Sequence, residues 1–205
     1  FEDSDIHHVS GGVDPMGDIE VINLELIMAD GETVSKRLSG VEKEVKRGDK
    51  AALDEKAVLE KLLPHLEAGL LANSLELTEE EGKLLGGLHL LTMKPFLYVC
   101  NKKQDSFNLD EQDDERWHKL LEFFERTGSD YVVVDAGMEH ELKDLDDVEK
   151  NEFRREYGAQ DSGVESLIRA SYNRLGLMSY FTTGEQETRA WTVPIGSTGP
   201  EAGGA

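Results

Sequence analysis

Apolar residues recur at helical spacing in the first part of the chain. Between residues 19 and 45 they step by three or four positions, which predicts one long helix with an apolar side. These positions are Ile19, Ile22, Leu26, Ala29, Val34, Leu38, Val41 and Val45. We expect a turn at Asp14-Pro15 before this helix, and Asp18 as its capping residue.

A second helix follows the turn predicted at residues 47–49. Its apolar positions are Leu59, Leu62, Leu63 and Leu66. The two helices and the short turn between them predict an antiparallel helical hairpin. Thr78 and Glu81 then have the spacing of a capping box, in which each side chain accepts a backbone N–H at the start of a helix.

The central part of the chain changes to continuous apolar runs. Residues 96–100 and residues 131–134 are β-prone and without polar interruption, which is typical of strands covered on both faces in a parallel sheet. The apolar face of a helix lies between them, at Trp117, Leu120, Leu121 and Phe124. Strand, helix and strand predict parallel pairing, so the loops after Cys100 and Val134 should lie at one sheet edge, where such folds bind ligands.

The last part of the chain predicts two helices, at residues 153–157 and 164–175, separated by breaks at Gly158 and Gly163. Residues 180–193 then have the pattern of a β-hairpin that begins a separate β-rich module.

The net charge of the chain argues against nucleic acids and membranes as direct partners. The chain has 43 acidic and 22 basic residues, a formal net charge of −21, which repels phosphate backbones and anionic lipids. Basic residues at 36–50 alternate with acidic ones, so a solvated helix face is favoured over an RNA contact. No apolar run approaches the roughly 20 residues of a membrane span. We expect no direct binding to DNA or membranes, and the single Cys100 fits a reducing, cytoplasmic location.

The loop after the first strand carries the candidate chemistry. Asn101-Lys102-Lys103-Gln104 resembles the Asn-Lys-x-Asp motif of P-loop GTPases, in which the Asn amide meets the purine edge and the Lys stem covers the base. The Asp carboxylate of that motif accepts from N1 and N2 of guanine. Gln104 presents an amide instead, which weakens guanine specificity, and Asp105 is displaced by one residue.

The loop after the second strand is the other half of the predicted site. Asp135-Ala136-Gly137-Met138 lies where such proteins place small residues whose backbone N–H groups touch the purine. Each loop alone is compatible with an ordinary polar loop or a strand-to-helix turn. Together, on neighbouring parallel strands, they predict a purine site.

A longer series of segments carries a family resemblance. The segments are Phe1-Glu2-Asp3-Ser4-Asp5-Ile6, Val13-Asp14-Pro15, Asp18-Ile19-Glu20-Val21-Ile22-Asn23, Gly48-Asp49-Lys50, Leu62-Leu63-Pro64-His65-Leu66, Ser74-Leu75-Glu76-Leu77-Thr78, Leu91-Thr92-Met93-Lys94-Pro95, Leu167-Ile168-Arg169-Ala170, Tyr180-Phe181-Thr182-Thr183-Gly184 and Arg189-Ala190-Trp191-Thr192. In this order they resemble the YchF family, the Obg-like ATPases, over nearly the whole chain.

The resemblance implies an α/β fold made of part of a P-loop NTPase parallel sheet, a helical-hairpin insertion and the start of a β-grasp (TGS) module. Residues 1–30 and 92–179 would form the C-terminal part of the NTPase (G) domain. Residues 31–91 would form the coiled-coil hairpin, and residues 180–205 the truncated start of the TGS domain.

The resemblance also implies function. The family hydrolyses ATP, often in preference to GTP, uses Mg²⁺ and associates with ribosomes. Its base motif reads Asn-x-x-Glu, which Asn101 matches and Gln104 does not. The purine-binding residues it implies here are Asn101, Lys102, Gln104, Ala136, Gly137 and Met138.

The phosphate-binding half of such a site is missing from the sequence. No Gly-x-x-x-x-Gly-Lys-[Ser/Thr] segment occurs, so the groups that hold the phosphates and Mg²⁺ are absent. Phosphoryl transfer depends on those groups, and we expect this chain alone to be inactive and to hold no cofactor tightly. Because the sequence begins at Phe1 without Met, we expect an internal fragment.

Two other interpretations concern the rest of the chain. The acidic helical hairpin could be a non-catalytic module that binds a protein or ribosomal partner. A metal site at His7-His8 is not expected, because adjacent histidines on a loop lack the spacing of metal ligands. The sequence predicts no catalytic residue.

Overall fold

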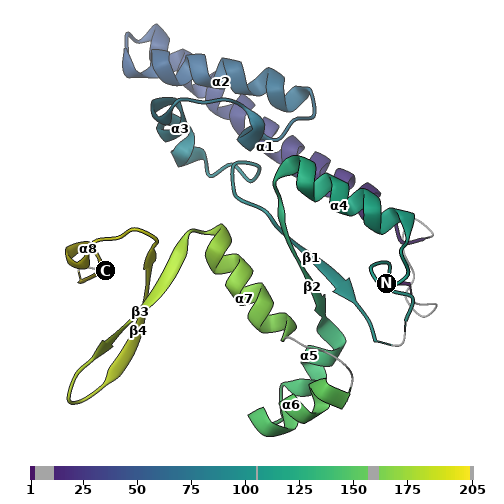
Figure 1. The fold of residues 1–205 in the computed structure, drawn as a ribbon. Helices are drawn as coiled ribbons and strands as arrows, with labels where there is room; N and C mark the ends of the chain where they lie inside the picture. Colours follow the sequence, from purple (N-terminus) through teal and green to yellow (C-terminus); the bar gives the residue numbers. More distant parts are fainter. Residues whose placement is uncertain (3–11, 105, 157–161, 204–205) are drawn as a thin grey trace. The chain divides into compact units, whose positions relative to one another are not determined.

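The computed structural model describes residues 1–2, 12–104, 106–156 and 162–203. His7-His8, Asp105 and the break at Gly158 therefore lie outside the described residues. The chain divides into two compact units, one formed by Asp14–Pro95 and the other by Phe1–Val13 with Phe96–Ala205 (Figure 1). The division into NTPase, hairpin and TGS segments remains a prediction.

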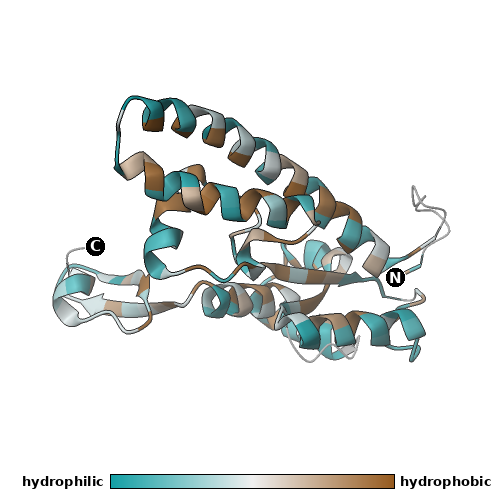
Figure 2. Cartoon of the chain, turned by 90° about the horizontal axis from the view of Figure 1, so that it is seen from above, coloured by the Kyte–Doolittle hydropathy of each residue, from teal (hydrophilic) through white to brown (hydrophobic). Residues whose placement is uncertain are grey.

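The first unit is built on the predicted helical hairpin. Helix α1 (Pro15–Lys46) and helix α2 (Ala51–Glu67) pack along their apolar sides, and Figure 2 shows these hydrophobic sides facing each other. Val34, Val41 and Leu59 are completely buried between them. The turn that joins the helices contains Gly48 at a φ of 91°, a left-handed conformation that glycine adopts without strain.

The cap of helix α1 lies four residues before the predicted cap at Asp18. Asp14 caps it instead, with Oδ1 accepting from the Gly17 N–H at 3.2 Å, and Pro15 is its first residue. The predicted turn at Asp14-Pro15 and the cap at Asp18 were therefore wrong. Proline suits the first helical position because its fixed φ matches the helix and its missing N–H would have no intrahelical partner.

The segment that returns from α2 is held by a buried carboxylate on α1. Asp30 is 2% exposed, and it accepts from the N–H groups of Leu91 and Thr92 at 2.7 Å each and from the Thr92 hydroxyl at 2.6 Å. Thr92 Oγ1 in turn accepts from Ala72 N at 3.0 Å, in the short 3-10 helix η1 (Ala72–Ser74). These contacts join three parts of the unit.

A short helix and a 3-10 turn complete this unit, α3 (Glu79–Leu85) and η2 (Gly86–Leu88). The predicted capping box at the start of α3 is confirmed. Glu81 N donates to Thr78 Oγ1 at 3.2 Å, and Thr78 N donates to Glu81 Oε2 at 2.7 Å.

The second unit contains the predicted parallel pair. Strand β1 (Leu97–Lys102) and strand β2 (Asp130–Asp135) are parallel, with helix α4 (Glu115–Thr127) between them in the chain. Helix α4 covers one face of the pair, where the Phe124 ring stacks on Tyr131 at 4.7 Å between centroids. Helix α7 (Gly163–Arg174) lies on the other side, against β2 (Figure 1). The predicted mixed α/β class is confirmed.

One detail of the strand prediction was wrong. Residues 96–100 were expected to be covered on both faces, but the Val99 side chain is 50% exposed. Its register partner Val132 is buried. The difference arises because α7 packs mainly on β2 and leaves this face of β1 open.

The chain continues from β2 through α5 (Ala136–Leu142) and α6 (Asp147–Glu156) to α7 and then to a hairpin. Strands β3 (Leu177–Thr183) and β4 (Thr188–Pro194) are antiparallel, which confirms the predicted β-hairpin, and α8 (Gly199–Gly203) follows. Within the part of the chain that is described, no helix is both long enough and apolar enough to cross a membrane.

Candidate functional site

The carboxyl ends of β1 and β2 bring the two predicted loops together. In the parallel register Lys102 lies opposite Asp135, so both strands end at the same level. Asn101 Oδ1 accepts a hydrogen bond from Ala136 N at 3.1 Å. The end of β1 and the first turn of α5 are therefore in direct contact, as the parallel pairing predicted.

This hydrogen bond fixes how the Asn101 amide is turned. A backbone N–H can only donate, so the atom of Asn101 that faces Ala136 is the oxygen. The NH₂ group therefore points elsewhere from an exposed side chain. Asn101 can donate to a ligand while it holds the second loop.

Asp135 joins the same two loops and was missed by the sequence analysis. Its Oδ2 accepts from Gln104 N at 2.7 Å, and its Oδ1 accepts from Met138 N at 2.9 Å as the N-cap of α5. An Asp directly before a helix is a common cap, and this signal could have identified half of its role. The bond to Gln104, 31 positions away in the sequence, depends on the fold.

Lys102 is held by acidic residues of the loop that follows β1. Its Nζ lies 2.8 Å from Glu111 Oε1 and 3.9 Å from Asp110 Oδ2. The hydrogen bond to Glu111 raises the pKa of Lys102 and lowers the pKa of Glu111. The ammonium group is therefore positively charged at neutral pH.

Asn108 closes the loop between these residues, a role that was not predicted from the sequence. It is 2% exposed, its Oδ1 accepts from Lys103 N at 3.0 Å and its Nδ2 donates to Lys103 O at 2.8 Å. Nδ2 also lies 3.2 Å from Glu111 Oε2. Asn108 thus fixes the backbone directly after Lys102.

The remaining predicted residues lie at the same edge. Ala136 and Gly137 are exposed, whereas Gln104 and Met138 are half-buried. The Met138 N–H is engaged by Asp135, so a contact of Met138 with a ligand would fall to its side chain. Asn101, Lys102, Gln104, Ala136, Gly137 and Met138 are therefore brought together, while Asp105 lies outside the described residues.

Helix α7 is also connected to this edge, through hydrogen bonds to α5. Glu139 Oε1 accepts from Gly163 N at 2.7 Å and lies 3.4 Å from the Ser162 hydroxyl, at the start of α7. A Cβ at Gly163 would lie 2.8 Å from Val134 Cγ1. The missing side chain of Gly163 therefore allows α7 to approach β2 closely.

The edge shows no sign of a metal or nucleophilic centre. No group of three or more His, Cys, Asp or Glu side chains that could hold a metal ion occurs among the described residues. Burial raises the pKa of the Cys100 thiol to about 11, so the thiol is protonated and unreactive at neutral pH. The arrangement can bind and orient a ligand through hydrogen bonds.

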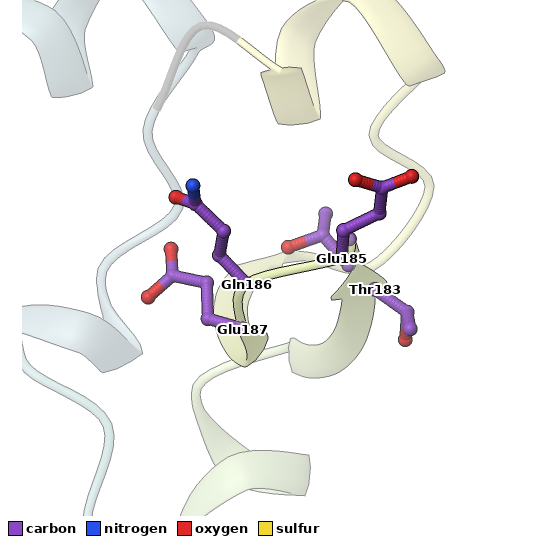
Figure 3. Close-up of a pocket in the computed structure, with 6 residues that line it drawn as sticks. Thr183, Glu185, Gln186 and Glu187 are labelled. Carbon is purple, nitrogen blue, oxygen red and sulfur yellow. The ribbon is translucent and has the colours of Figure 1, made fainter.

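A separate hollow lies at the turn between β3 and β4. It is lined by residues 182–187, and Figure 3 shows Glu185 and Glu187 pointing away from each other. These side chains converge on no common point, so the hollow has no arrangement of groups suited to a ligand.

Comparisons with known proteins identify relatives over the full length of the chain. It is 48% identical over 204 residues to "Ribosome-binding ATPase YchF" of Bacillus subtilis (strain 168), which covers 100% of this chain and 56% of the relative. It is 43% identical over 204 residues to the protein of the same name from Escherichia coli O157:H7, covering 100% of this chain and 55% of the relative. The chain thus spans about half the length of the curated relatives it matches. No family model matches the chain.

A solved structure has the same fold. The chain aligns with "Structure of the Schizosaccharomyces pombe YchF GTPase" with a TM-score of 0.82 and 30% sequence identity, over 99% of this chain and 55% of the other. The alignment covers both units of the chain, including the helical hairpin and the β1–β2 edge.

Proposed function

We propose, from the homology of this chain to the YchF ribosome-binding ATPases over its whole length, that it supplies the purine-binding edge of a nucleotide-binding switch protein. The homology confirms the family resemblance found in the sequence motifs. The observation that carries the proposal is the hydrogen bond between Asn101 Oδ1 and Ala136 N, which sets an amide donor of one loop beside the turn of the other.

Each predicted residue has a proposed role at this edge. Asn101 donates from Nδ2 to the purine ring, and the stem of Lys102 covers one face of the base. Gly137, exposed and without a side chain, leaves room for the base to approach the backbone. Gln104 and Met138 border the base, and Gln104 offers no charged acceptor pair to guanine. We therefore propose that adenine is accepted at least as well as guanine.

The proposed ligand of the longer protein is ATP or GTP with Mg²⁺. The described residues of this chain offer no cluster of metal ligands, so no step of catalysis is assigned to them. We expect the chain alone not to hydrolyse nucleotide. By the names of its relatives, we also propose a ribosomal partner and a cytoplasmic location.

Isothermal titration calorimetry with ATP and GTP tests the purine site. We expect the chain to bind purine nucleotides weakly and Asn101→Ala to lose that binding, because the variant removes the donor and the link to Ala136. Asn173→Ala is the matched control, since Asn173 is an exposed amide on α7 in the same unit. Absence of binding by the unaltered chain, or equal binding by Asn101→Ala, would count against the site and in favour of the acidic hairpin as an interaction module.

A further inference from the structure

We infer that Asp135 is a positioning residue that holds the two purine-contacting loops at a fixed separation. The inference rests on the proposed function and deepens it, because it names the group that organises the site. Asn101 and Gly137, the two residues proposed to meet the base most directly, lie at the end of β1 and in the first turn of α5. Their spacing must be kept if one ring is to contact both.

The geometry at Asp135 goes beyond helix capping. A cap needs one acceptor, and Oδ1 fills that role by accepting from Met138 N at 2.9 Å. The other oxygen is directed to a different loop and accepts from Gln104 N at 2.7 Å. One carboxylate therefore spans the gap between the loop after β1 and the first turn of α5.

The neighbouring residues leave room for this carboxylate. A Cβ added at Gly137 would lie 3.3 Å from Asp135 Oδ1, which is tighter than an ordinary van der Waals contact. Asn101 makes a second, parallel link between the loops through Ala136 N. Asp135 and Asn101 thus form two cross-links, and only Asn101 retains a donor for a ligand.

Asp135→Asn removes one of the two acceptors of this carboxylate. The amide has the same shape as the carboxylate but only one oxygen, so one of the two backbone donors must face its NH₂ group. Loss of one hydrogen bond to a charged acceptor predicts a roughly 10-fold increase in the Kd for ATP.

The control is Asp14→Asn. Asp14 caps α1 through a single bond to Gly17 N, so an amide oxygen can replace it fully. We expect Asp14→Asn to leave the Kd for ATP and the amide exchange rates of Gln104 and Met138 unaltered. Both variants should keep the circular dichroism spectrum of the unaltered chain.

Site-resolved amide hydrogen exchange decides the inference without any nucleotide. Asp135→Asn should accelerate exchange at Gln104 or Met138 by about tenfold, with no change at Val132 in the middle of β2. Unchanged exchange at both amides would overturn the inference even if nucleotide binds. A different outcome is that exchange accelerates at Gln104 or Met138 and stays unchanged at Val132 while the unaltered chain binds no purine. In that case the loops are cross-linked as described, and it is the proposed function that fails.

Discussion

The side chain of Asp30 shows how a charged residue can be buried in this chain without a cation. Its two oxygens accept three hydrogen bonds from Leu91 and Thr92, all between 2.6 and 2.7 Å. Donors of this kind replace the water that the carboxylate loses on burial, which would otherwise make burial costly. Asp135 uses the same chemistry at the β1–β2 edge.

Replacing Asp30 with Asn should destabilise the helical unit. The amide retains one oxygen, and its NH₂ group would face a buried donor from Thr92 or Leu91. We expect the free energy of unfolding to fall by about 1–3 kcal/mol. Urea denaturation followed by circular dichroism measures this, with Glu32→Gln, an exposed neutralisation on the same helix, as the control. Equal stability of the two variants would contradict the role given to Asp30.

At the scale of single residues, the sequence predicted which residues lie side by side better than it predicted the hydrogen bonds between them. Asn101 and the 136–138 turn lie together, as expected from their positions at the ends of two parallel strands, while their binding to a purine remains a proposal. Asp135 and Asn108 were missed as partners of Gln104 and Lys103, because a bond from a side chain to a distant backbone N–H depends on the exact path of both loops.

At the scale of elements, the start of α7 lies close to β2. Gly163 is its first residue, and an added Cβ there would lie 2.8 Å from Val134 Cγ1 and 3.5 Å from Val134 Cα. The valine side chain is stiff, and Val134 is itself buried. The sequence analysis treated Gly163 only as a helix break, since the need for a close approach cannot be seen before α7 is placed on β2.

Gly163→Ala should therefore destabilise the second unit. Overpacking of this contact predicts a loss of about 1–3 kcal/mol in the free energy of unfolding. Gly31→Ala in the middle of α1 should instead raise stability by about 0.5–1 kcal/mol, because nothing lies within 4 Å of its added Cβ and alanine favours the helix. Thermal unfolding of both variants measures whether stability changes in opposite directions. An increase in stability for Gly163→Ala would refute the close contact.

The helices and strands were predicted correctly where a hydrophobic pattern continued over many residues, but the start of α1 and the burial of β1 were not. The helical hairpin was anticipated from its hydrophobic period, the parallel strands from two continuous apolar runs with a helix between them, and the β3–β4 pair from its hairpin pattern. The start of α1 was misplaced because Asp14-Pro15 has the composition of a turn as well as that of a helix cap. The exposure of Val99 could not be anticipated, since an apolar run does not reveal which strand a covering helix will favour.

At the scale of the whole molecule, the helical unit has its own core. Leu62 and Val34 are fully buried, and the Asp30 contacts close the unit through the segment at residues 91–92. The sequence indicated the hairpin but not this closure, because the partners are separated by more than 60 residues.

We expect residues 14–95 to fold without the rest of the chain. The isolated segment should be helical and should unfold cooperatively in urea, because its buried side chains are covered by residues of the same unit. A shorter segment of residues 14–70 contains both long helices but lacks the partners of Asp30, and it should be clearly less stable. Non-cooperative melting of residues 14–95 in circular dichroism would be the contrary result.

The short junction after α7 connects the β-hairpin, through this helix, to the carboxyl ends of β1 and β2. Gly176 connects the helix to β3, and its carbonyl accepts from Ile195 N at 2.7 Å, so both strands of the hairpin are anchored at the end of the helix. The other end is fastened to α5 by Glu139. Helix α7 has 12 residues and is therefore roughly 18 Å long. Because a helix of this length moves as a rigid element, a tilt of its first turn would also move the hairpin.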